Sequence, residues 1–154
     1  MPHIHEAMDF SVETYIVFDK KVLLRFHDKY NIWLGVGGHV ELDENPNQAA
    51  VREIKEEVGL DVELFDQSGL VGKHSENYLE LIPPAFLDVH RISETHQHIG
   101  MRYFAKAFSD EIVEPEDEKS GGCKWMTREE VESATDIDEL IKMYALKAME
   151  VLGE

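Results

Sequence analysis

The chain has 154 residues, of which 43% are hydrophobic and 31% charged, an ordinary balance for a protein that folds around one core. Its formal net charge of −17 argues against binding of extended nucleic acid, because an acidic surface repels a phosphate backbone. The single cysteine, Cys123, excludes an internal disulfide, and no apolar run is long enough to cross a membrane. We therefore expect a soluble, cytoplasmic protein without a membrane partner, with a flexible arm at 1–10 and one domain at 11–154.

The first part of the chain predicts a β-hairpin. β-Branched and aromatic residues dominate 12–18, a short turn follows, and residues 21–27 form the second strand. The sequence WLGVGGHVE then occupies 33–41, where glycines permit close approach of the backbone to another group. Trp33 is a candidate for stacking on a nucleobase, and packing in the core is at least as good an interpretation.

Strong start and stop signals predict a helix over residues 46–58. Asn45 is a good N-cap, and Gln48 three residues later completes a capping box. Pro46 falls at the first helical position, where its missing N–H is not needed. Gly59 follows the last apolar residue of the helix and can adopt the left-handed conformation that ends it.

Three glutamates of this helix form a cluster. Glu53, Glu56 and Glu57 stand at i, i+3 and i+4, so their side chains project from one side and repel one another. A hard divalent cation would offset the repulsion, and oxygen ligands suit magnesium, manganese or calcium rather than zinc. The alternative for this pattern alone is a solvated acidic helix face.

The spacing around the glutamates favours the metal site. Gly38 is followed by five residues and Glu44, and then by seven residues and the sequence REIKEEVGL, which begins at Arg52. The stretch 38–60 resembles the complete signature box of the Nudix hydrolases at every defining position. The resemblance implies a Nudix-type α/β/α sandwich with a mixed β-sheet between helices. It also implies hydrolysis of a diphosphate linkage, with Mg²⁺ or Mn²⁺ as cofactor.

The resemblance assigns roles to single residues. Glu53, Glu56 and Glu57 are implied to bind the metal, and one of them, or a glutamate from a later loop, to act as general base. Arg52 is implied to orient these side chains by charge-assisted hydrogen bonds, which makes the four residues the catalytic candidates. Gly37 matches the position that supplies a backbone carbonyl to the metal.

Two loops supply further candidates. Many family members use another acidic residue before the last strand, where this chain has Glu116, Asp117 and Glu118, and the spacing favours Glu118 as a metal ligand. His96 and His98 flank one residue of another loop and, in an extended segment, would point the same way. They are candidates for substrate binding, and ordinary exposed histidines are the alternative.

The rest of the chain predicts more strands and two helices. Strands are expected over four segments: 61–65, 85–92, 99–108 and 124–126. Residues 73–84 read mostly as a loop. A capping box at Thr127 and Glu130 predicts a short helix over 128–133, and Thr135 is expected to cap the last helix. This order predicts a mixed sheet that is covered on both faces by helices.

Substrate and assembly are less constrained. The resemblance implies a nucleoside diphosphate derivative, such as an ordinary or oxidised nucleoside triphosphate, a nucleotide sugar or a dinucleotide. A non-catalytic Nudix domain that binds or senses a nucleotide is the main alternative, although such domains usually have an eroded box. Isopentenyl diphosphate isomerase shares the fold but needs a cysteine early in the chain, and Cys123 comes late. A homodimer is among the assemblies that we consider.

Overall fold

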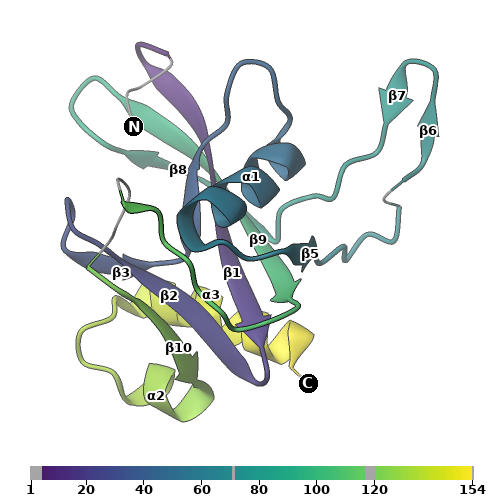
Figure 1. Ribbon diagram of the computed structural model, residues 1–154. Coiled ribbons are helices and arrows are strands. Elements are labelled where there is room, and N and C mark those ends of the chain that lie inside the picture. The colour runs from purple at the N-terminus through teal and green to yellow at the C-terminus, as the bar shows by residue number, and fades with distance from the viewer. Residues whose placement is uncertain (1–4, 71, 117–120, 154) are drawn as a thin grey trace.

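A large mixed β-sheet lies between helices in the computed structural model, which describes residues 5–70, 72–116 and 121–153 (Figure 1). The strands are β1 (Met8–Phe18), β2 (Lys21–His27), β3 (Ile32–Leu34), β4 (Val36–His39), β5 (Val62–Leu64), β6 (His74–Ser75), β7 (Tyr78–Leu79), β8 (Phe86–Arg91), β9 (Gln97–Ala107) and β10 (Cys123–Thr127). The helices are α1 (Pro46–Val58), α2 (Arg128–Ser133) and α3 (Glu139–Leu152). Within these residues, no helix has both the length and the hydropathy that a membrane span requires.

Strand β1 is the centre of the sheet. The main path of neighbouring strands is β10-β2-β1-β9-β5, while β3 also pairs with β2, β4 with β1 and β8 with β9. The β1–β9 pair is parallel and the other pairs are antiparallel. Asp9 is the register partner of His98, and Ser11 is the partner of His39. This pairing brings the starts of β1 and β9 and the end of β4 together.

The predicted hairpin of β1 and β2 is confirmed. Asp19 and Lys20 both have positive φ, 48° and 62°, as a two-residue type I′ turn requires. Strand β1 nevertheless begins at Met8, four residues before the predicted start at Val12. Residues 8–10, which the sequence assigned to the N-terminal arm, belong to this strand because they pair with the start of β9, a partner distant in sequence.

Helix α1 has the predicted bounds, Pro46–Val58, and the predicted caps. The Asn45 side chain accepts a hydrogen bond from Gln48 N–H, the Gln48 side chain accepts one from Asn45 N–H, and Gly59 has a φ of 72°. One face of the helix packs on the sheet through five buried residues: Ala49, Ala50, Glu53, Ile54 and Val58. The buried face of α1 therefore contains one carboxylate, that of Glu53.

Helix α3 covers the opposite face of the sheet, so the predicted α/β/α sandwich is confirmed (Figure 1). Its residues Ile141, Tyr144 and Ala148 pack in one cluster with Tyr15 and Phe104 from the sheet. The prediction that Thr135 caps this helix is wrong. The Asp138 side chain is the cap and accepts from Leu140 N–H, because the helix begins only at Glu139.

Two predicted loops contain strand. The short hairpin β6–β7 interrupts the loop expected at 73–84, and in Figure 1 it extends away from the body of the protein. Strand β9 begins at Gln97, which places His98 in the sheet rather than in a loop. The parallel partner β1 extends the strand here, and no local pattern shows that partner.

Candidate active site

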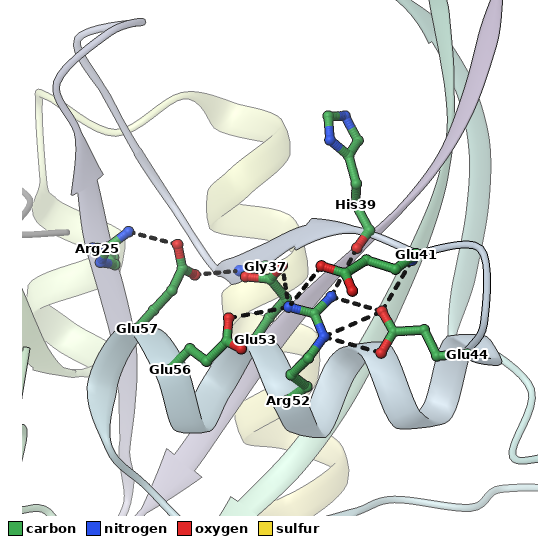
Figure 2. Close-up of polar contacts among 9 residues, drawn as sticks. All are labelled: Arg25, Gly37, His39, Glu41, Glu44, Arg52, Glu53, Glu56 and Glu57. Carbon is green, nitrogen blue, oxygen red and sulfur yellow. Dashed lines mark hydrogen bonds and ion pairs between the residues drawn. The ribbon is translucent and has the colours of Figure 1, made fainter. Parts of the chain in front are cut away.

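The three glutamates of α1 form what we call the glutamate face: Glu53, Glu56 and Glu57 (Figure 2). Their environments differ strongly. The side chain of Glu53 is 4% exposed, that of Glu57 is 16% exposed and that of Glu56 is 52% exposed. The helix spacing therefore places one carboxylate inside the protein, one at its edge and one in solvent.

Glu53 is held against the backbone of β4. A Cβ atom added at Gly38 would overlap with the Glu53 carboxylate, so a glycine is needed for the helix to pack this close. The Arg52 Nη1 group donates to Glu53 Oε1 at 2.9 Å. Burial of a carboxylate is costly unless a partner compensates its charge, and the neighbouring guanidinium supplies that compensation.

Glu57 bridges the helix to two strands. Its Oε1 atom accepts from Gly37 N–H at 3.2 Å, and its Oε2 atom accepts from Arg25 Nη1 at 2.9 Å. Arg25, on β2, also donates to Glu114 at 3.3 Å. Arg25 was not predicted, because no fixed spacing relates it to the helix. Its position among the apolar residues Val22, Leu23, Leu24 and Phe26 was the available signal.

Arg52 connects most of the acidic groups (Figure 2). It donates to Glu44 through Nε at 2.9 Å and Nη2 at 2.6 Å, to Glu56 through Nη1 at 3.1 Å, and to the backbone carbonyl of His39 at 3.0 Å. Its hydrogen bonds with Glu44 are the main reason why the pKa of Arg52 is raised and the pKa of Glu44 is lowered. The predicted contact of Arg52 with the glutamate face is therefore present at Glu53 and Glu56, and Glu44 is a further partner.

The composition of the glutamate face fits a hard cation. All its side-chain donors are carboxylate oxygens, the ligand type that suits Mg²⁺ and Mn²⁺. Gly37 lies directly beside Glu57, as its hydrogen bond shows, so the backbone position predicted to bind the metal adjoins a predicted carboxylate ligand. Arg25 and Arg52 hold the like charges in place, and a bound cation would add to that compensation.

Trp33, a predicted site residue, lies apart from the glutamate face, and Glu118, another, lies outside the described residues. Trp33 packs edge-to-face on Phe26 at 5.3 Å, and its Nε1 donates to Asp136 at 3.2 Å. It packs against the core cluster on the α3 side of the sheet, opposite α1. Glu118 lies outside the described residues, as does Asp117.

The two predicted histidines join a second group, which we call the histidine cluster: Asp9, His39, His96 and His98. His39 Nε2 lies 3.2 Å from His98 Nε2, and His96 Nε2 lies 3.0 Å from Asp9 Oδ2. Figure 2 shows the His39 ring directed away from the glutamate face. Asp9 and His39 were not predicted here, since only the strand pairing brings them to His98.

Comparison with known proteins agrees with this geometry. The sequence model of the NUDIX domain matches residues 12–146. The chain belongs to the Nudix family. A NUDIX-family hydrolase from Clostridium perfringens has 34% sequence identity and a TM-score of 0.81, and the match covers 94% of this chain and 97% of that chain. The protein is thus a Nudix hydrolase, as the signature box predicted.

More distant relatives show the breadth of the family. The MutT NUDIX hydrolase from Burkholderia pseudomallei has 19% identity and a TM-score of 0.66, with 92% of this chain and 98% of that chain covered. The m7GpppN-mRNA hydrolase NUDT17 of Xenopus laevis is 29% identical over an alignment of 124 residues, and the match covers 72% of this chain. The match spans only 38% of the length of that relative.

Proposed function

We propose that this Nudix hydrolase cleaves a phosphoanhydride bond in a nucleoside diphosphate derivative, with Mg²⁺ or Mn²⁺ bound at the glutamate face. The observation that carries the proposal is the position of Glu53. Its carboxylate is nearly buried against Gly38 and is oriented by Arg52, although a buried acidic group costs stability. A buried acidic group that lowers stability and has a specific charged partner is typical of functional sites.

Each residue of the face has a proposed task. Glu53, Glu56 and Glu57 hold the cation together with the carbonyl of Gly37, and one glutamate takes the proton from the attacking water. When bound, the cation withdraws charge from the phosphate oxygens and lowers the pKa of a bound water. Arg52 keeps the carboxylates of Glu53 and Glu56 in position through its Nη1 group.

The proposed substrates are small nucleotides: ordinary or oxidised nucleoside triphosphates, nucleotide sugars and dinucleotides. The net charge of −17 disfavours a long phosphate backbone unless cations bind with it. The name of the Xenopus relative includes a capped mRNA, which also contains a phosphoanhydride chain. A capped oligonucleotide therefore belongs among the substrates to be tested, next to the small molecules.

Turnover of a substrate panel tests the proposal. Purified protein is incubated with each compound and Mg²⁺, and the phosphate, pyrophosphate and mononucleotide products are separated by chromatography. We expect turnover that stops with a chelator and is nearly lost in Glu53→Gln. The matched control is Glu63→Gln on β5, which removes an exposed charge and should keep the parental rate. Turnover in excess chelator would contradict the proposal, while tight binding without turnover would support the non-catalytic alternative.

Thermal melting tests the metal site independently of the substrate. A cation that binds only the folded state at 100 times its Kd adds about 2.7 kcal/mol to the free energy of unfolding. We expect a Mg²⁺ shift in melting temperature that exceeds the shift from monovalent salt at equal ionic strength. A variant with all three glutamates replaced by glutamine should lose the excess. Equal shifts in parent and variant would mean that the glutamate face is only solvated charge.

A further inference from the structure

The histidine cluster lies on the opposite side of β4 from the glutamate face. Asp9 comes from β1, His39 from β4 and His98 from β9, and the register of the three strands sets them side by side. Each of these side chains offers one ligand atom, and the three atoms lie within 4.8 Å of one another. Three donors from three strands thus meet at one point of the sheet.

The spacing of the donors is close to that of a metal site. His39 Nε2 and His98 Nε2 are 3.2 Å apart, and His39 Nε2 and Asp9 Oδ2 are 4.0 Å apart. Tetrahedral zinc, with bonds of about 2.0–2.1 Å, places its ligand atoms about 3.3 Å apart. The two imidazoles already have this separation, whereas the Asp9 carboxylate, now 4.0 Å from His39 Nε2, has to move closer to complete the site.

The residues of the histidine cluster are also mostly buried and are held by hydrogen bonds, unlike histidines on a protein surface. Asp9 is 1% exposed, His39 6% and His96 5%. Asp9 Oδ1 accepts from His5 N–H at 2.8 Å, and Asp9 Oδ2 faces His96 Nε2 at 3.0 Å. His96 in turn faces the backbone carbonyl of Glu6 through Nδ1 at 2.9 Å. Hydrogen bonds of this kind fix the orientation of metal ligands in many proteins.

We propose that Asp9, His39 and His98 bind Zn²⁺ and leave a fourth coordination position open. Two imidazole nitrogens and one carboxylate oxygen suit zinc or a similar transition metal, whereas Mg²⁺ and Ca²⁺ prefer oxygen ligands alone. Three protein ligands with an open fourth position are the pattern of reactive rather than purely structural zinc. His98 is only half-buried, so a water or an oxygen of a bound ligand can reach that position.

His39 links the proposed zinc site to the surroundings of the glutamate face. The His39 ring belongs to the histidine cluster, and the His39 carbonyl accepts from Arg52, which also holds Glu53 and Glu56. The two ligand sets nevertheless have no side chain in common. Zinc binding is therefore separable from the proposed metal-dependent hydrolysis, and each proposal can fail without the other.

Metal binding by the untagged 154-residue chain tests the inference. Equilibrium dialysis against Zn²⁺ with metal analysis measures affinity, and the visible absorption of bound Co²⁺ reports ligand type and geometry. In a variant with Glu53, Glu56 and Glu57 all changed to glutamine, we expect one Zn²⁺ per chain. Loss of an outer partner of a metal ligand lowers affinity about 10- to 100-fold, so loss of a ligand should lower it by at least about 100-fold. We expect that loss in His98→Asn and, as a second ligand variant, in His39→Asn.

A neighbouring histidine provides the control. His90 lies on β8 with its ring 5.6 Å from that of His98, and its Nδ1 is 2.7 Å from Asp88. His90→Asn should keep the parental affinity, and His96→Asn should lower it about 10- to 100-fold because His96 orients Asp9. Circular dichroism without metal establishes that each variant is folded. If a ligand variant does not fold, the Co²⁺ spectrum of the glutamine triple variant decides.

Three results would overturn the inference. The first is absence of stoichiometric Zn²⁺ in the glutamine triple variant, which would assign any binding to the glutamate face. The second is equal loss of affinity in His90→Asn and His98→Asn, which would mean that histidine density alone attracts the metal. The third is a weak octahedral Co²⁺ spectrum in place of the intense tetrahedral bands.

Discussion

Strand β4 separates two polar sites of opposite composition. On one side, the glutamate face offers only oxygen donors, and Arg25 and Arg52 balance its charge. On the other side, the histidine cluster offers three imidazoles and one carboxylate. The Asp9 carboxylate is hydrogen-bonded to the His96 ring and to the backbone N–H of His5. The difference in donors implies a difference in cation, hard on the first side and borderline on the second.

The two sites also differ in how they are assembled. The glutamate face comes from consecutive turns of one helix, so a single short segment determines it. The histidine cluster combines Asp9 of β1, His39 of β4, His98 of β9 and His96 just before β9, and it depends on the parallel pairing of β1 and β9. The four predictions below test the glutamate side of this contrast, from the largest expected effect to the smallest.

The largest effect is expected for Glu57→Gln. Loss of a charged metal ligand should raise the barrier by several kcal/mol, and about 4 kcal/mol corresponds to roughly a 1000-fold drop in kcat. The free energy of unfolding should also fall by about 1–3 kcal/mol, because Arg25 and Gly37 lose a charged acceptor. Glu56→Gln should lower kcat but change stability by less than about 0.5 kcal/mol, since its side chain is exposed.

Steady-state kinetics with Mg²⁺ and urea unfolding measure both quantities. Equal free energies of unfolding in Glu57→Gln and Glu56→Gln would contradict the prediction that the less exposed glutamate contributes more to stability. Parental kcat in Glu57→Gln would remove this residue from the proposed metal ligands. Glu63→Gln, which neutralises an exposed glutamate on β5, is the control for a change of net charge.

The next effect compares the two glycines of β4. An added Cβ at Gly37 would overlap with the backbone carbonyl of Val12, whereas at Gly38 it would overlap with the Glu53 side chain. Backbone cannot move aside as a side chain can. Gly37→Ala should therefore lower the free energy of unfolding by about 3 kcal/mol, at the upper end for overpacking, and Gly38→Ala by less.

The loss of activity in Gly38→Ala should exceed what its small loss of stability predicts. Gly38→Ala displaces the Glu53 carboxylate and should lower kcat in the fraction that remains folded. Calorimetric melting and kcat per folded molecule separate the two effects. If Gly38→Ala lowers the free energy of unfolding as much as Gly37→Ala does, the Glu53 carboxylate cannot move aside. That result would contradict the difference that we expect between the two glycines.

The contrast in assembly explains what the sequence was able to predict. Helix α1 was predicted with its bounds because Asn45, Gln48 and Gly59 act within a few residues of one another. The contact of Arg52 with Glu53 and Glu56 was implied by the signature box, which lies in one short segment of the chain. Arg25 was missed, because it reaches Glu57 only after β2 has packed beside β1.

The histidine cluster shows the limit more clearly. His96 and His98 were noticed as a pair, but they were assigned to a loop and given no partner. Asp9 was placed in the N-terminal arm, although it is nearly fully buried in β1. The parallel pair of β1 and β9 joins residues about 90 positions apart, and no local periodicity encodes that pairing.

A smaller effect is expected where the two sites meet. Arg52→Lys keeps the charge but loses the paired hydrogen bonds to Glu44 and the bond to the His39 carbonyl. We expect a loss of about 2 kcal/mol, which for a domain of this size lowers the melting temperature by about 4–8 °C. The control is Arg128→Lys, whose exposed pair with Glu132 should contribute at most about 1 kcal/mol. Equal losses in both variants would mean that Arg52 acts only as a surface charge.

The smallest effect is a pH dependence of the glutamate side. The hydrogen bonds from Arg52 lower the pKa of Glu44 in the folded protein. A lowered folded pKa contributes stability above the unfolded pKa, about 4.3 for glutamate, and that contribution is lost as the pH falls through the folded pKa. Glu44→Gln cannot titrate, so it lacks the contribution at every pH.

The melting temperature of the parent should therefore exceed that of Glu44→Gln at pH 7 and pH 5. The gap should close as the pH falls below about 4.3, because the parent then carries a protonated glutamate as well. Melting at pH 7, 5, 4 and 3 at constant ionic strength measures the gap. A gap that stays constant or widens in acid would show that the variant is destabilised by lost packing. Glu63→Gln, whose exposed side chain lies on β5, should show no such closing gap.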